Sequence, residues 1–226
     1  MIDLNQEGLG TPLVIPSEHG SLHGSLVLQP NSPGLIVLAH AALALDGRDA
    51  VLAGFLRHAG LSTLSVDLLA RDEERFPDAH NNVPVLAKRL LVFLDQIRHR
   101  MLMGEVATQP VGLCAANTTS AVVVRIASQR DHDIAAIVCR GGLIDLAGIL
   151  YLRSLASPLL LLHEQSDVQH IASNRRALQE IRCPCELRII ADIGFDFAVS
   201  PGFDAAARNT LQWFLAKLNT TSSAQP

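Results

Sequence analysis

The feature that most constrains this sequence is its alternation of short, almost wholly apolar runs with longer segments of helical spacing. Unbroken apolar runs are typical of strands that are buried on both faces of a sheet. The strand-type runs are 34–39, 61–67, 111–116, 134–139, 158–162 and 186–190. The helix-type segments between and after them are 48–58, 84–101, 118–128, 172–181 and 207–218. This alternation predicts an α/β fold with a mainly parallel central sheet and helices on both of its faces.

The front of the chain follows a different pattern. Two short β-type runs, 13–15 and 25–28, are separated by glycines and followed by the turn-forming segment 30–34. This pattern predicts an antiparallel hairpin that precedes the parallel sheet. We find no linker and no internal repeat, so residues 1–226 are expected to form one domain. The polar residues 219–226 are expected to fray.

Charge and cysteine usage exclude several classes of protein. The formal net charge is -4 and no basic cluster is present, which argues against a nucleic-acid partner. The first residues lack the pattern of a secretory signal, and the apolar run near 35–45 is too short to span a membrane. Cys114 and Cys139 lie in apolar runs, and Cys183 and Cys185 form a pair that no second pair matches. We therefore predict a cytoplasmic protein without structural disulfides, metal or cofactor.

In a parallel α/β sheet, ligands bind beyond the carboxyl ends of the strands. The polar residues that directly follow the predicted strands are therefore the candidates for a functional site. They are His40, Asn117, Arg140, the segment 163–167 and the segment 192–196. The acidic segment 71–75 does not follow a strand directly and is predicted to be a solvated loop.

Several segments of this chain are similar to those of the α/β-hydrolases, especially the small proteins grouped with dienelactone hydrolases. The strings that carry the similarity are 110–113, 140–142, 145–148, 174–178 and 213–215. The resemblance extends from about Leu35 to about Leu218. It implies the α/β-hydrolase fold and, by family precedent, hydrolysis of esters or lactones by a triad of nucleophile, acid and histidine.

The resemblance also shows where this sequence departs from the family. The nucleophile normally lies on a tight strand-to-helix turn flanked by glycines. The matching segment here, 115–119, places Asn117 at the nucleophile position and has neither glycine. The acid position matches Asp167, whereas the histidine position matches Asp196. An amide is not a nucleophile, and a carboxylate does not relay protons at neutral pH as imidazole does. These positions predict a member that no longer hydrolyses its ligand.

The loop that would supply the oxyanion donors is also unusual. His40 is followed by Ala41 and Ala42, where the family tends to have a glycine-rich or serine-rich loop. Backbone N–H groups of Ala41 or Ala42 and of Thr118 could still bind a carbonyl or an anion. His40 is expected to hold this loop by a hydrogen bond. Arg140 is expected to contribute to ligand binding.

Two functions remain open from the sequence. The first is a non-hydrolytic protein that binds a small molecule in the former active site or serves as a scaffold. Asp167 and Asp196 could face this pocket together and recruit Arg140, or a cationic or polar ligand. The second is a working ester or lactone hydrolase in which Cys114 replaces the nucleophile and His163 acts as its base or activates water. A Cys114 thiol that points into an open pocket near His163 would favour the enzyme, and a buried thiol would favour the binding protein. No oligomeric state follows from the sequence.

Overall fold

The computed structural model describes residues 10–41, 47–73, 75–129, 134–191 and 201–222. Its strands form one sheet in the order β1-β2-β4-β3-β5-β6-β7-β8. The strands are β1 (Thr11–Ser17), β2 (Gly20–Val27), β3 (Leu35–His40), β4 (Ser62–Asp67), β5 (Val111–Ala116), β6 (Ile134–Arg140), β7 (Leu159–Glu164) and β8 (Cys185–Ile190). β2 is antiparallel to both β1 and β4, and all later pairs are parallel. The predicted hairpin and parallel sheet are confirmed.

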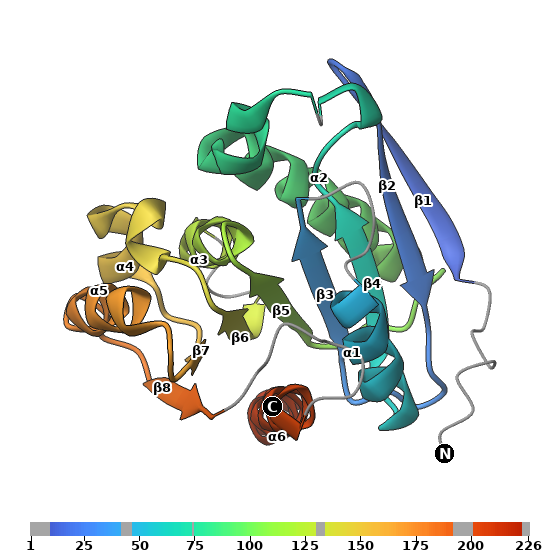
Figure 1. The fold of residues 1–226 in the computed structure, drawn as a ribbon. Coiled ribbons are helices and arrows are strands. Elements are labelled where there is room, and N and C mark those ends of the chain that lie inside the picture. Colours follow the sequence, from blue (N-terminus) through green and yellow to red (C-terminus); the bar gives the residue numbers. More distant parts are fainter. Residues whose placement is uncertain (1–9, 42–46, 74, 130–133, 192–200, 223–226) are drawn as a thin grey trace.

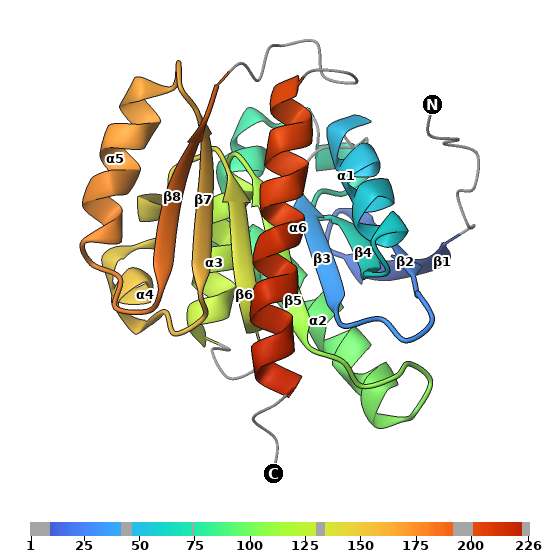
Figure 2. The same ribbon diagram turned by 90° about the horizontal axis from the view of Figure 1, so that it is seen from below.

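Helices cover both faces of this sheet (Figures 1 and 2). The α-helices are α1 (Gly47–His58), α2 (Val83–Leu102), α3 (Thr119–Gln129), α4 (Ile149–Ser154), α5 (Val168–Leu178) and α6 (Pro201–Ser222). Three short 3-10 helices are η1 (Arg71–Glu73), η2 (Pro77–Asn81) and η3 (Ile144–Ala147). Helices α1 and α6 lie on one face, and α2, α3, α4 and α5 lie on the other. No helix in the described part of the chain is long and apolar enough to cross a membrane.

Each face of the sheet has its own apolar core. Successive side chains of a strand point to opposite faces, and β5 shows this clearly. Leu113 and Ala115 join the core beneath α2 and α3, together with Phe93. Cys114 joins the core beneath α1 and α6, together with Phe214. Strands that are buried on both faces explain why the apolar runs in the sequence are unbroken.

The order of the strands fixes where a ligand can bind. After β3 the chain pairs β4 on one side of β3, and it then returns to pair β5 on the other side. The chain therefore leaves β3 and β5 towards helices on opposite faces of the sheet, α1 and α3. Such a switch point, at the carboxyl ends of the strands, is the usual ligand site of an open α/β sheet.

The structure corrects some local predictions. Residues 71–73 form η1, and Glu73 is buried rather than solvated because it pairs with Arg89 of α2. Helix α5 begins at Val168, earlier than predicted, and α4 was not predicted. Helix α6 continues to Ser222, whereas the tail was expected to fray from Asn219. Extending an existing helix adds one hydrogen bond for each residue, which favours continuation even through threonines.

Candidate functional site

Asn117 occupies a tight turn between the end of β5 at Ala116 and the start of α3 at Thr119. Its backbone φ is 52°, in the left-handed region that few residues other than glycine adopt. Its side chain is exposed. A strained strand-to-helix turn that presents one side chain at the top of the sheet is the geometry of a nucleophile elbow. The structure therefore places Asn117, and not Cys114, at the elbow.

The elbow is held by the β6–η3 turn and by the first residues of α3. The Asn117 N–H donates to the carbonyl of Arg140 at 3.1 Å, and the Ser120 N–H donates to the Asn117 carbonyl at 3.0 Å. The Ser120 hydroxyl donates to the carbonyl of Gly141 at 2.9 Å. A Cβ on Gly142, whose φ is 77°, would lie 2.6 Å from the carbonyl carbon of Asn117. The glycine pair of the β6–η3 turn thus allows the two turns to pack backbone against backbone.

Asp167, at the acid position, lies between β7 and α5 and accepts hydrogen bonds from two histidines. The Nδ1–H of His163 donates to Asp167 at 3.1 Å, and the Nδ1–H of His170 donates at 2.9 Å. Burial alone would raise the pKa of Asp167, but the hydrogen bonds from His163 and His170 outweigh it and lower the pKa. Asp167 is therefore a carboxylate at neutral pH with both histidines as its partners.

His163 is fully engaged by its surroundings. It is 1% exposed. Its Nε2 accepts a hydrogen bond of 2.6 Å from the Nδ2 of Asn174, and its Nδ1–H donates to Asp167. Burial lowers the pKa of His163 and outweighs the opposing effect of Asp167, which favours the neutral ring. Neither nitrogen is left to take a proton from a substrate. His163 is therefore not placed to act as a base.

Cys114 does not meet His163. Its side chain is 1% exposed in the core beneath α1 and α6. His163 lies two residues after Leu161, which belongs to the core on the other face, and it bonds to Asn174 of α5. Burial raises the pKa of the Cys114 thiol to about 11, so the nucleophilic thiolate is disfavoured. The predicted alternative of a Cys114–His163 pair is wrong, because the sheet separates the two side chains.

Arg140 points to the same face as Cys114 and forms an ion pair with Asp49 in the first turn of α1. Burial alone would lower the pKa of Arg140, but Asp49 and Cys114 raise it, so the guanidinium remains charged. Its described ion pair is with Asp49 and not with Asp167. The expected association of Arg140 with the two aspartates therefore does not form with Asp167. Asp196 lies outside the described residues, as does Ala42.

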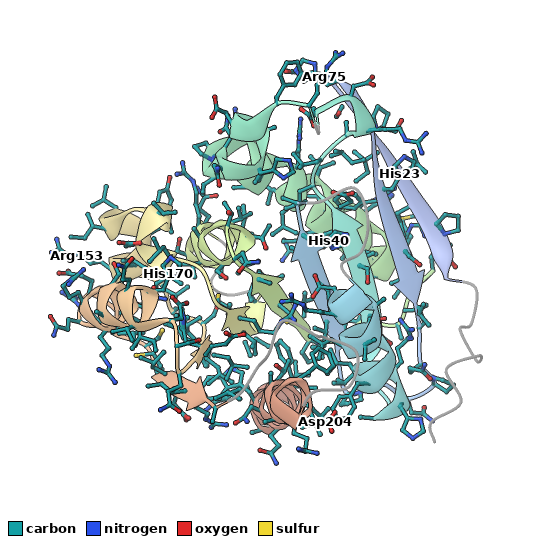
Figure 3. All side chains as sticks on the ribbon, viewed as in Figure 1. His23, His40, Arg75, Arg153, His170 and Asp204 are labelled. Carbon is teal, nitrogen blue, oxygen red and sulfur yellow. The ribbon has the colours of Figure 1, made fainter. Side chains whose placement is uncertain are left out.

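The described end of the oxyanion loop meets a segment that the sequence analysis missed. The Nδ1–H of His80, in η2, donates to the carbonyl of Ala41 at 2.9 Å. Next to it, the Thr118 hydroxyl donates to the side-chain oxygen of Asn81 at 3.2 Å. Helix η2 thus bridges the ends of β3 and β5 over the switch point. His40, at the end of β3, is 9% exposed (Figure 3).

No metal cluster marks the elbow among the described residues. Within the described ranges, no three His, Cys, Asp or Glu side chains gather where they could hold a metal ion. A hollow of about 270 Å³ lies on the other side of η2, where Asp78 and Ala79 form part of its wall. Glu73 and Arg89 also line this hollow, together with Phe76.

Comparison with known proteins supports the fold. A dienelactone hydrolase from Anabaena variabilis superposes with a TM-score of 0.82 at 27% identity, covering 92% of this chain and 97% of its own. Est1E from Butyrivibrio proteoclasticus superposes with a TM-score of 0.74 at 10% identity, covering 93% of this chain and 99% of its own. An α/β serine hydrolase homologue from Coxiella burnetii superposes with a TM-score of 0.65 at 14% identity, covering 91% of this chain and 96% of its own. No protein-family model matches the chain.

Curated relatives are longer proteins. A predicted phosphoribosyl transferase of Mycobacterium tuberculosis strain H37Rv is 29% identical over 197 residues, and the same figures hold for strain CDC 1551. The match covers 86% of this chain but 44% of the relative. The chain thus spans less than half the length of the curated relatives that it matches.

The eight-stranded sheet, its two helical layers and the elbow at its carboxyl edge define an α/β-hydrolase fold. Within that class, the chain is similar to a dienelactone hydrolase, as the sequence resemblance predicted.

Proposed function

We propose that this protein binds a small polar molecule at the elbow site and does not hydrolyse it. The observation that carries the proposal is Asn117 itself: an exposed amide in the left-handed conformation of a nucleophile elbow. An amide can donate and accept hydrogen bonds, but no neighbouring base converts it into a nucleophile. The site keeps the geometry that presents a side chain to a ligand and lacks the atom that would attack it.

The neighbouring groups favour a neutral polar ligand over a cation. Asp167 already accepts hydrogen bonds from His163 and His170, and Arg140 is paired with Asp49. At the elbow Asn117 is exposed and Thr118 is half-buried, and both side chains are uncharged. Uncharged donors and acceptors suit ligands with carbonyl, hydroxyl or amide groups.

We do not extend phosphoribosyl transfer to this chain. The relatives that carry this name are more than twice as long as the matched segment, and the matched chain has an α/β-hydrolase fold. One fold hosts many functions, so the elbow chemistry carries more weight here than the name of a longer relative.

The proposal is tested first by assaying turnover. Wild type, Cys114→Ala and the double variant Asn117→Ser/Asp196→His are compared on p-nitrophenyl acetate and a simple lactone. We expect no turnover by wild type or Cys114→Ala, and a gain in the double variant. Turnover by wild type would refute the non-hydrolytic proposal, and its loss in Cys114→Ala would identify the thiol as the nucleophile after all.

Binding is tested separately by thermal shift. Neutral lactones, hydroxy amides, small amines and divalent metal ions are screened against wild type and against Asn117→Leu, which fills the elbow with an apolar side chain. We expect neutral polar compounds to raise the melting temperature of wild type and not that of Asn117→Leu. A screen in which none of these compounds stabilises wild type would contradict the binding function.

A further inference from the structure

Helix η2 brings a histidine to the elbow from a part of the chain that has no counterpart in the predicted triad. His80 and Asn81 are consecutive, and they contact the residues that follow β3 and β5, respectively. His80 bonds to Ala41 after β3, and Asn81 bonds to Thr118 after β5. In the sheet, Ala39 of β3 is paired directly with Ala115 of β5. Ala41 and Asn117 therefore lie at neighbouring strand ends, with His80 above them.

The hydrogen bond to Ala41 fixes which tautomer the neutral His80 ring adopts. A carbonyl oxygen can only accept, so Nδ1 must carry the hydrogen that it receives. In the neutral ring, Nε2 then holds the lone pair and is the only nitrogen able to accept a hydrogen. Among the described residues, Nε2 has no hydrogen-bond partner, and it is not a buried atom. A backbone carbonyl that orients one ring nitrogen and leaves the other free is a common arrangement for working histidines.

His163 and His170, which lie near the end of β7, are excluded by their contacts. Both nitrogens of His163 are engaged in the interior. His170 is bonded to Asp167 on the α5 side, well away from the end of β3 where His40 lies (Figure 3). The described contacts thus bring His80 to the end of β3, and its Nε2 has no hydrogen-bond partner among the described residues.

We propose that His80 is the hydrogen-accepting residue of the elbow site. Its Nε2 accepts a hydrogen from a hydroxyl or amide N–H of the ligand, while Asn117 and Thr118 bind the polar groups beside it. The ligand class is therefore a small carbonyl compound that also carries a hydroxyl or N–H group. This inference rests on the proposed binding function, because it assigns a partner group at the same site.

The proposal is tested by placing a reporter nucleophile at the elbow. In Asn117→Ser, the serine hydroxyl passes its proton to Nε2 of His80 as its oxygen attacks the acetyl carbon of p-nitrophenyl acetate. The p-nitrophenolate then leaves, and Nε2 releases its proton to the solvent. In the second step Nε2 takes a proton from water as the water oxygen attacks the acyl carbon, and it returns this proton to the serine oxygen as acetic acid leaves. A neighbouring imidazole in reach of the hydroxyl is the ordinary requirement for such activation. We expect measurable turnover by this single variant, without any change at Asp196.

His80→Asn supplies the decisive comparison, because the asparagine amide nitrogen can still donate to Ala41 but Nε2 is lost. We expect Asn117→Ser/His80→Asn to lose turnover by about 10²-fold or more relative to Asn117→Ser. The matched control is Asn117→Ser/His99→Asn, which removes an exposed histidine of α2 and should retain full turnover. Equal activity in the two double variants, or an inactive but folded Asn117→Ser, would overturn the role of His80.

A second readout does not depend on turnover. In wild type, nitrogen-15 NMR of the ring should show His80 as the neutral form protonated at Nδ1. A ring protonated at Nε2 would contradict the assignment. Failure of either test leaves the non-hydrolytic function standing, because that function depends on wild type alone and not on His80.

Discussion

At the scale of single residues, the conformation of the elbow depends on a residue that is distant in sequence. Asn117 tolerates a left-handed φ better than most residues, yet its turn is closed by contact with Gly142. The missing Cβ of Gly142 is what allows the two backbones to touch. A side chain at position 142 would therefore act on the elbow directly.

Gly142→Ala should lower the free energy of unfolding by more than the ordinary cost of a left-handed alanine. Gly60→Ala is the matched control, since Gly60 has a φ of 87° and open space where a Cβ would lie. The control should cost about 1–2 kcal/mol for its backbone conformation alone, and Gly142→Ala should add a steric cost that brings it to roughly 3 kcal/mol or more. Urea denaturation measures both, and equal losses would show that the contact with Asn117 carries no strain.

His163 should make stability depend on pH. Burial lowers its pKa below the ordinary value of about 6.5, so the unfolded chain binds a proton that the native protein does not bind. Stability is therefore complete above this value and falls as the pH drops below it, when the proton on Nε2 must displace the hydrogen bond from Asn174. Asp167, whose pKa is lowered, loses its contribution only in the more acidic range below about 4.

The measurement compares melting temperatures between pH 7.5 and pH 5.5. The wild type should lose stability across this range, and His163→Asn, which cannot titrate, should show a smaller loss. His99→Asn removes an exposed histidine and should follow the wild type. A wild-type slope that survives in His163→Asn would assign the effect to another group.

At the scale of elements, a buried ion pair ties η1 to α2. Arg89 donates to both oxygens of Glu73, at 2.7 and 2.5 Å, and also to the carbonyl of Leu68. Glu73 further accepts the N–H of Ala70 at 2.8 Å. This pair anchors the connection between β4 and α2, from which η2 reaches the elbow.

Arg89→Ala should be strongly destabilising, because it leaves the Glu73 carboxylate buried without its partner. Removing one partner of a buried pair typically costs about 3–5 kcal/mol, whereas replacing both with apolar groups of similar size can be nearly neutral. We therefore expect Glu73→Leu/Arg89→Met to recover most of the stability that Arg89→Ala loses. Chemical denaturation of the three proteins tests this, and a double variant as unstable as Arg89→Ala would argue against the buried pair.

The elements that the sequence predicted are those whose signal is local. Apolar runs and helical spacing reveal β3, β5 and α2, because the burial of these elements determines the polarity of residues that are close together in the sequence. Helix η1 was missed because the burial of Glu73 depends on Arg89, a partner supplied by another element. In the same way Asn117, Asp167 and Arg140 were found by position after strands, but the meeting of His80 with Ala41 could not be read from spacing.

At the scale of the whole molecule, one sheet separates two apolar cores. Phe93 fills the core beneath α2 and α3, and Trp213 belongs to the core beneath α1 and α6. Because both cores share the same strands, neither can be lost while the sheet remains intact. Folding should therefore be cooperative across the two faces.

The chain contains a single tryptophan, which makes this cooperativity measurable. Phe93→Leu should destabilise the protein by about 1 kcal/mol through loss of packing on the far face from Trp213. The unfolding midpoints from tryptophan fluorescence and from far-ultraviolet circular dichroism should then fall together. A fluorescence midpoint that stays at its wild-type value while the other falls would mean that the two faces unfold separately.

The glycine pair after β6 has a consequence for how such a protein can change over time. The shape of the elbow is set by that turn and by backbone hydrogen bonds, neither of which depends on the side chain at position 117. Exchanging the side chain at that position therefore costs about 1–2 kcal/mol at most, through the left-handed φ, and leaves the turn in place. A scaffold of this kind can lose a reaction, bind a ligand instead and later regain a reaction. This is possible because different residues determine its shape and its reactivity.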